Sequence, residues 1–226
     1  MVNVVEQADD YVRIEHVLVS VSDKSGLDRL VAGLLALNPK VRFFATGGTY
    51  RAIASILGEA QTEMHLTQVS TYTGQPETQG GLVKTLDFKI YLGLLTETYN
   101  EAHRADLERT GAVPIDMVVV NLYPFESTVA RDGVTVEKAR ANIDIGGPCM
   151  LRAAAKNYPR VVPVVDPKDY EPLLSALWEN DGQLDMATRF AYARKAFAHT
   201  AAYDAAIVDF LRRQDPSAVA RVYELA

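Results

Sequence analysis

The chain has 226 residues, of which 48% are hydrophobic and 23% are charged, and its formal net charge at pH 7 is −6. This length and apolar content can form a sizeable core in one domain, or in one domain with a helical appendage. The negative charge disfavours a general nucleic-acid binder and a binder of bilayer surfaces, because both partners are polyanions that favour basic faces. An anionic ligand would therefore have to be bound by a local arrangement of donors.

Cysteine usage and the absence of targeting signals predict a cytoplasmic protein without a metal. The single cysteine, Cys149, cannot form an internal disulfide and has no second thiol with which to share a metal ion. The four histidines are scattered, and none lies at a metal-ligand spacing from another or from Cys149. Residues 1–16 lack the apolar core of a signal peptide, and no apolar run approaches the roughly 20 residues that span a membrane. We expect no metal, no cofactor, and neither a nucleic-acid nor a membrane partner.

The first 45 residues predict a strand, a helix and a second strand. Residues 17–21 form a short β-branched run, which is typical of a strand that is covered on both faces. Asp23 is a candidate cap for a helix over residues 26–37, where apolar residues recur at helical spacing until an Asn-Pro pair ends the pattern. A second strand over residues 41–45 leads into two glycines.

The rest of the chain continues the alternation of strands and helices. Residues 116–121 and 161–165 are predicted as buried strands, and helical patterns follow through residue 178 and over residues 186–211. This alternation predicts an α/β fold with a doubly wound, mostly parallel sheet, whose ligands gather at the carboxyl ends of the strands. Residues 70–95 contain two clusters of turn formers and little periodicity, so we expect a long loop there that could line a site.

The turn Thr46-Gly47-Gly48-Thr49 stands between a predicted strand and a predicted helix. A helix N-terminus has unpaired N–H groups and the positive end of the helix dipole, and glycines allow an anion to approach the backbone closely. Thr46 and Thr49 could add hydroxyl donors. The alternative is a tight connection that holds no ligand, since glycine is common in turns of every kind.

Two further stretches place polar groups where a ligand could lie. Lys84 and Thr85 belong to a glycine-bounded loop, in which a lysine could meet an oxygen that gains charge during a reaction. The alternative is an ordinary solvated lysine. Asn121 and Tyr123 follow a predicted buried strand, where open α/β sheets bind ligands, although a tyrosine packed beneath a loop is the common alternative.

A fourth stretch, Asp144-Ile145-Gly146-Gly147-Pro148, is typical of the start of a helix with free N–H groups. Arg152 and Lys156 lie four residues apart on that helix and share a face, which could collect negative charge. The alternative makes Asp144 a cap and the two cations a solvated stripe.

Taken together, these stretches resemble the inosine monophosphate cyclohydrolase domain of the bifunctional purine-biosynthesis enzyme. The resemblance covers nearly the whole chain and implies a methylglyoxal-synthase-like fold. The chain has no room for the formyltransferase half of that enzyme. The resemblance therefore implies a stand-alone cyclohydrolase domain over residues 1–184, followed by a helical extension over residues 185–226 that packs on it or on a dimer partner. The matching segments, in order, are residues 20–24, 46–49, 83–86, 121–125, 144–148, 152–157 and 195–204.

The family's reaction closes the purine ring of 5-formamidoimidazole-4-carboxamide ribotide to give inosine monophosphate. By resemblance, Lys84 and Tyr123 polarise or protonate oxygens of the reacting groups. Asp144 and Lys156 form the pair that handles the carboxamide and its proton, with the identity of the base left open. The resemblance also implies a homodimer and a separate formyltransferase partner.

The resemblance also implies a set of residues that bind the purine nucleotide monophosphate. The glycine turn, together with a lysine and hydroxyl groups nearby, holds the 5′-phosphate, and a threonine and an asparagine orient the base. The predicted binding residues are Ser22, Lys24, Thr46, Gly47, Gly48, Thr49, Thr85, Asn121, Ile145 and Gly146.

Several positions depart from the family pattern near one loop. Ala45 replaces a serine before the glycine turn, and Leu82 replaces an arginine before the loop lysine. Asp87 and Phe88 replace a histidine and a proline. These departures make a nucleotide-sensing or partner-binding domain that has lost its chemistry the second hypothesis. A methylglyoxal synthase is a third and remoter one, since that fold shares the phosphate turn.

Overall fold

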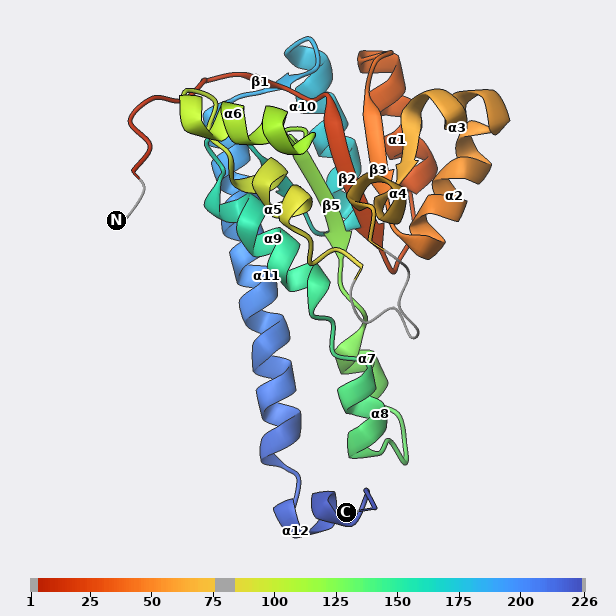
Figure 1. The fold of residues 1–226 in the computed structure, drawn as a ribbon. Coiled ribbons are helices and arrows are strands. Elements are labelled where there is room, and N and C mark those ends of the chain that lie inside the picture. Colours follow the sequence, from red (N-terminus) through yellow and green to blue (C-terminus); the bar gives the residue numbers. More distant parts are fainter. Residues whose placement is uncertain (1–3, 76–83, 225–226) are drawn as a thin grey trace.

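A five-stranded parallel sheet lies at the centre of the computed structural model, which describes residues 4–75 and 84–224 (Figure 1). The strand order is β4-β3-β2-β5-β6, with every neighbouring pair parallel. A short antiparallel pair, β1 with β7, lies apart from this sheet. The strands are β1 (Val12–Arg13), β2 (His16–Val21), β3 (Arg42–Ala45), β4 (Leu66–Gln68), β5 (Met117–Asn121), β6 (Val162–Val164) and β7 (Gln183–Leu184).

Helices cover both faces of the sheet, which produces two hydrophobic layers. On β2, Val17 and Val19 point into one layer and Leu18 points into the other, as the two-residue period of a strand requires. The first layer is covered by α1 (Leu27–Leu37), α2 (Gly47–Leu57) and α10 (Tyr170–Glu179). The second is covered by α5 (Phe88–Leu95), α9 (Gly146–Lys156) and α11 (Met186–Arg212). The predicted doubly wound α/β fold is confirmed.

Shorter helices fill the connections between these elements. Two of them, α7 and α8, lie beyond the carboxyl edge of the sheet, next to the part of α11 that extends past it (Figure 1). The remaining helices are α3 (Glu59–His65), α4 (Val69–Thr73), α6 (Glu101–Thr110), α7 (Phe125–Val129), α8 (Val136–Ala141) and α12 (Pro216–Ala220). Among the described helices, none combines the length and apolar character that crossing a lipid bilayer needs.

The predicted long loop over residues 70–95 is wrong at both ends. Its start belongs to α4 and its end to α5, while residues 76–83 lie outside the described part of the chain. Asp87 caps α5 by accepting a hydrogen bond from the Lys89 N–H at 2.8 Å. Ile90 and Leu94, one helical turn apart, are fully buried. Two apolar residues one helical turn apart are too few to predict a helix in a segment that is rich in turn formers.

The cap predicted at Asp23 is also wrong. The helix α1 begins at Leu27, after Gly26 in the left-handed region with φ of 69°. The Asp23 carboxylate instead accepts hydrogen bonds from the N–H and hydroxyl of Ser25, at 2.9 and 2.6 Å, within the turn that precedes the helix. These bonds hold the pKa of Asp23 below its usual value.

The long helix α11 packs on β6 and α9. Ala193, Ala196 and Tyr203 contribute to the same hydrophobic layer as the strands β2 and β5. The part of α11 that lies against the sheet therefore belongs to the sheet's own core. The boundary that was predicted at residue 184 stays a prediction.

Arg189 anchors the start of α11 in the interior. Its side chain is fully buried and donates hydrogen bonds to the main-chain carbonyls of Asp9, Asp10, Tyr158, Pro159 and Leu184. One guanidinium thus joins the N-terminal segment, the turn between α9 and β6, and β7 to the helix. Burial lowers the pKa of Arg189, while the nearby carboxylates of Asp10, Asp185 and Asp9 favour its charged form.

We predict that Arg189→Met lowers the free energy of unfolding by about 3 kcal/mol or more, because buried carbonyls lose their donors. Chemical denaturation measures this change. The exposed residue Arg194 on the same helix gives the control, since Arg194→Met should alter stability by less than about 0.5 kcal/mol. Equal stability of the two variants would contradict the anchoring role.

Candidate active site

The candidate site lies at the carboxyl edge of the parallel sheet. From β2 the chain winds outward through β3 to β4 and then returns to form β5 on the other side of β2. The carboxyl ends of β2 and β5 are therefore the switch point of the sheet, where open α/β folds bind ligands. Of the polar residues singled out in the sequence, those in the segments 22–24, 46–49 and 121–123 lie at the ends of β2, β3 and β5.

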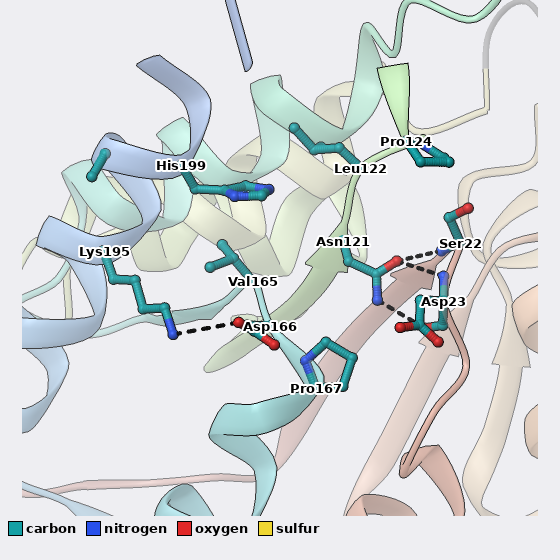
Figure 2. A pocket seen from close by; sticks show the side chains of 11 residues that line it. Ser22, Asp23, Asn121, Leu122, Pro124, Val165, Asp166, Pro167, Lys195 and His199 are labelled. Atoms are coloured by element: carbon teal, nitrogen blue, oxygen red, sulfur yellow. Dashed lines mark hydrogen bonds and ion pairs between the residues drawn. The ribbon is translucent and has the colours of Figure 1, made fainter. Parts of the chain in front are cut away.

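Asn121 joins the two strands at this switch point (Figure 2). Its side-chain oxygen accepts hydrogen bonds from the N–H groups of Ser22 and Asp23, at 2.6 and 2.8 Å. Its amide nitrogen donates to the carbonyl of Asp23 at 2.8 Å. The amide therefore fixes the turn after β2, and one N–H is left over for the predicted role of orienting a base.

The glycine turn forms the N-terminus of α2. Thr46 is the N-cap residue, but its hydroxyl pairs with the Ser20 hydroxyl at 3.0 Å instead of capping the helix. Gly47 has φ of 32°, and a Cβ there would meet no atom within 4 Å. The first-turn N–H groups of Gly47 and Gly48 have no earlier helical turn to accept them. The turn can therefore present them to an anion.

Thr49 has a different role from the predicted phosphate contact. Its hydroxyl accepts from the Val21 N–H at 3.0 Å and donates to the Val21 carbonyl at 3.2 Å. Its own N–H donates to the Thr46 carbonyl at 2.9 Å. With the side chain buried, Thr49 has no free donor for a phosphate. It ties α2 to β2.

Two cations lie beside the glycine turn. The Lys24 ammonium lies 3.5 Å from the Val21 carbonyl and 3.4 Å from that of Ser22, at the end of β2. The Arg51 guanidinium lies 3.8 Å from the position that a Cβ on Gly48 would occupy. Sequence reasoning missed Arg51. Its spacing of three residues from Gly48 was the available signal, because such residues share a helix face.

Three separate loops meet on the first turn of α9. A Cβ at Gly146 would lie 2.6 Å from the Thr85 hydroxyl oxygen. A Cβ at Gly147 would lie 2.6 Å from Cδ2 of Leu122 and 2.7 Å from Oδ2 of Asp144. The two glycines are needed because neighbouring side chains occupy the space that any larger residue would fill.

This meeting point brings together the loops of three predicted catalytic residues. Lys84 precedes Thr85 and is exposed, and Tyr123 follows Leu122 and is 52% exposed. Asp144 is half-buried, and its Oδ1 accepts a hydrogen bond from the Gly147 N–H at 2.9 Å. That bond holds the carboxylate on the first turn of α9 while its second oxygen can still accept a proton or a hydrogen bond.

Lys156, the fourth predicted catalytic residue, lies elsewhere. It is the last residue of α9, ten residues after Gly146, so the two lie about 15 Å apart along the helix axis. The structure does not bring it together with Asp144, and the expected pair is not formed within one chain. Ile145, in contrast, is at the meeting point, where it is 61% exposed as the N-cap residue of α9.

A cavity of about 460 Å³ adjoins the switch point on the side of β6 and α11 (Figure 2). It shares Ser22 and Asn121 with the predicted binding set. Sequence reasoning missed most of its other lining residues, because β6 and α11 are distant in the sequence. These are Asp23, Leu122, Pro124, Val165, Asp166, Pro167, Lys195, Ala198 and His199.

Lys195, which lines this cavity, is paired with carboxylates. Lys195 lies 2.7 Å from both carboxylate oxygens of Asp169 and 3.9 Å from Asp166. Burial lowers the pKa of His199, so its imidazole is neutral at pH 7. Within the described residues, no group of three or more histidine, cysteine or acidic side chains is arranged to hold a metal ion.

Comparison with known families identifies the chain. The sequence profile of the MGS-like domain matches residues 26–149, more than half of the chain, and that of the AICARFT/IMPCHase bienzyme matches residues 154–226. The chain belongs to the MGS-like domain family, which confirms the predicted fold type.

Individual proteins that match the chain include PurH proteins and one solved structure. The bifunctional purine biosynthesis protein PurH of Magnetococcus marinus is 48% identical over 203 residues, which cover 90% of this chain and 37% of that protein. The PurH of Leptospira biflexa is 44% identical, with 90% and 38% covered. The chain thus spans little more than a third of these relatives. The crystal structure of ForH superposes with a TM-score of 0.72 at 33% identity, covering 88% of this chain and 99% of that one.

We predict that Gly147→Ala lowers the free energy of unfolding by about 1–3 kcal/mol, because its methyl group overlaps Leu122 and Asp144. The matched control is Gly48→Ala, which adds a methyl group to the first turn of α2, where the nearest atom is 3.8 Å away. Chemical denaturation of both variants measures the difference. If Gly147→Ala is no less stable than Gly48→Ala, the loops do not pack on α9 as described.

Proposed function

We propose that this chain catalyses the dehydrative ring closure of 5-formamidoimidazole-4-carboxamide ribotide to inosine monophosphate. The observation that carries the proposal is the meeting of the loops of Lys84, Tyr123 and Asp144 on the first turn of α9. The profile of the AICARFT/IMPCHase bienzyme and the 44–48% identity to PurH proteins support it.

The reaction defines what the site has to supply. The carboxamide nitrogen attacks the formyl carbon, a C–N bond forms, and the formyl oxygen leaves as water with one proton from the carboxamide nitrogen and one from the formamido nitrogen. A carboxamide is a weak nucleophile because its lone pair is delocalised. The site must therefore stabilise charge that develops on the formyl oxygen and move protons between the two groups.

The three side chains fit these tasks. The exposed Lys84 ammonium stabilises the oxygen that gains charge, since it is a point charge on a flexible stem. The Tyr123 phenol donates a proton or a hydrogen bond to the same group. The second oxygen of Asp144 accepts a proton from the carboxamide, while its first oxygen stays on the Gly147 N–H. Lys156 has no part in this arrangement within one chain.

The phosphate of the nucleotide is bound at the start of α2. The N–H groups of Gly47 and Gly48 and the positive end of the helix dipole favour a dianion there. Lys24 and Arg51 supply the positive charge that a chain of net charge −6 otherwise lacks. Ser22, which is exposed at the end of β2, adds a hydroxyl donor.

A domain that binds a purine nucleotide without closing the ring is the second candidate. Ala45, which is fully buried, supplies no hydroxyl beside the glycine turn. Asp87 is weaker support for this second candidate than Ala45 is. Its carboxylate accepts hydrogen bonds from Gln75 and Lys89 at 2.7 and 2.8 Å and so stabilises the fold of the loop. Leu82 lies outside the described residues. The homodimer and a separate formyltransferase partner stay predictions.

We predict that Lys84→Ala and Asp144→Asn each reduce kcat for ring closure by about 100-fold or more, since each removes a group that acts on developing charge or on a proton. Conversion of the formylated ribotide, followed chromatographically without added metal, measures the rate. Lys40→Ala, an exposed lysine beyond the opposite edge of the sheet, should match the wild type.

Two results would contradict this mechanism in different ways. Wild-type rates in both variants would remove Lys84 and Asp144 from the chemistry. A wild-type chain that binds inosine monophosphate but forms none from the formylated ribotide would favour the nucleotide-sensing domain.

We also predict that Lys24→Ala raises KM for the ribotide by about 10- to 100-fold while kcat changes little, because a charge-assisted contact to phosphate contributes about 1.5–3 kcal/mol. Steady-state kinetics separate the two parameters. Arg42→Ala is the control, since Arg42 is exposed at the opposite end of β3. A loss confined to kcat would place Lys24 at the reacting atoms instead of the phosphate.

A further inference from the structure

Tyr203 on α11 holds the turn that carries Asp144. Its side chain is 9% exposed, and its hydroxyl accepts a hydrogen bond from the Asp144 N–H at 2.8 Å. The same hydroxyl donates to the Asn142 carbonyl at 3.4 Å. One buried group thus joins two points of the segment between α8 and α9, and the direction of Asp144 depends on it.

The ring of Tyr203 also supports the loop that carries Tyr123. It packs edge-on against Phe125, with ring centroids 6.1 Å apart and an angle of 68° between the planes. Phe125 lies two residues after Tyr123 and is fully buried. A second residue of α11, Phe210, contacts Phe125 at 6.0 Å and 87°. Both contacts fix the start of α7 against the long helix.

We propose that Tyr203 is a positioning residue for ring closure, which sets the Asp144 carboxylate and the Tyr123 phenol in their relative places without touching the substrate. The inference rests on the proposed function. It also gives a role to residues 195–204 of α11, which are distant in the sequence from every predicted catalytic residue. In this account α11 is a necessary part of the active site.

The hydroxyl is suited to this role because it stays protonated. Burial raises the pKa of Tyr203, so at neutral pH the group keeps both its donor hydrogen and its acceptor lone pairs. A phenylalanine at this position would keep the ring contact with Phe125 and lose only the two hydrogen bonds. Tyr203→Phe therefore isolates the effect on the Asp144 turn.

The test compares Tyr203→Phe with Tyr192→Phe in the full chain. Tyr192 is on the same helix, and its hydroxyl donates to the Asp169 carbonyl at 3.4 Å, so both variants lose a tyrosine hydroxyl that bonds to main chain. We expect Tyr203→Phe to reduce kcat by about 10- to 100-fold with KM within about twofold, since a displacement of about 1 Å at a catalytic group can have that effect. Tyr192→Phe should leave both parameters unchanged.

Hydrogen–deuterium exchange gives a readout that does not depend on turnover. The Asp144 amide should exchange faster in Tyr203→Phe than in the wild type, and at the wild-type rate in Tyr192→Phe. Unchanged kcat and unchanged exchange in Tyr203→Phe, in a chain whose wild type is active, would overturn this inference alone. So would faster exchange without any loss of kcat. A wild type that does not close the ring would overturn the proposed function, and this inference with it.

Discussion

The close packing of three loops on Gly146 and Gly147 is the constraint on which the candidate site depends. Side-chain atoms of Thr85, Leu122 and Asp144 lie 2.6–2.7 Å from the positions that Cβ atoms on the two glycines would occupy. The loops reach α9 only because Gly146 and Gly147 have no side chain. Segments near residues 84, 122 and 144 are thereby brought to one place. The proposed chemistry comes from Lys84 and Tyr123, the chain neighbours of Thr85 and Leu122, and from the second oxygen of Asp144 itself.

The two halves of the site use different means of recognition. At α2 the proposed donors are main-chain N–H groups at a helix N-terminus, with Lys24 and Arg51 beside them, and such donors suit an anion of almost any kind. At α9 the proposed groups are the side chains of Lys84, Tyr123 and Asp144, whose types match proton transfer and charge stabilisation. Asn121 connects the halves, because its amide holds the turn after β2 to the end of β5. A nucleotide that spans both would place its phosphate and its base on opposite sides of the switch point.

The sequence predicted the features that depend on local patterns and missed those that depend on distant contacts. Short apolar runs located β2, β3, β5 and β6, since strands buried on both faces require mostly apolar residues. Gln75 and Asp87, which bond across twelve positions, show why the region around α5 was misjudged. Thr49 bonds to Val21, 28 positions away, and Tyr203 bonds to Asp144, 59 positions away. No sequence pattern predicts contacts between residues so far apart. Spacing along α9 could have shown that Lys156 lies far from Asp144 within one chain, because eleven helical residues separate the ends of the helix widely, and its catalytic role stays a prediction.

The most direct test of the central claim is a crystal structure of the chain with inosine monophosphate. The account predicts one nucleotide at the switch point, with its phosphate on the N–H groups of Gly47 and Gly48 and its purine in contact with both Lys84 and Asp144. A nucleotide bound instead in the cavity between Asp166 and His199, or one that reaches only one of Lys84 and Asp144, would contradict it.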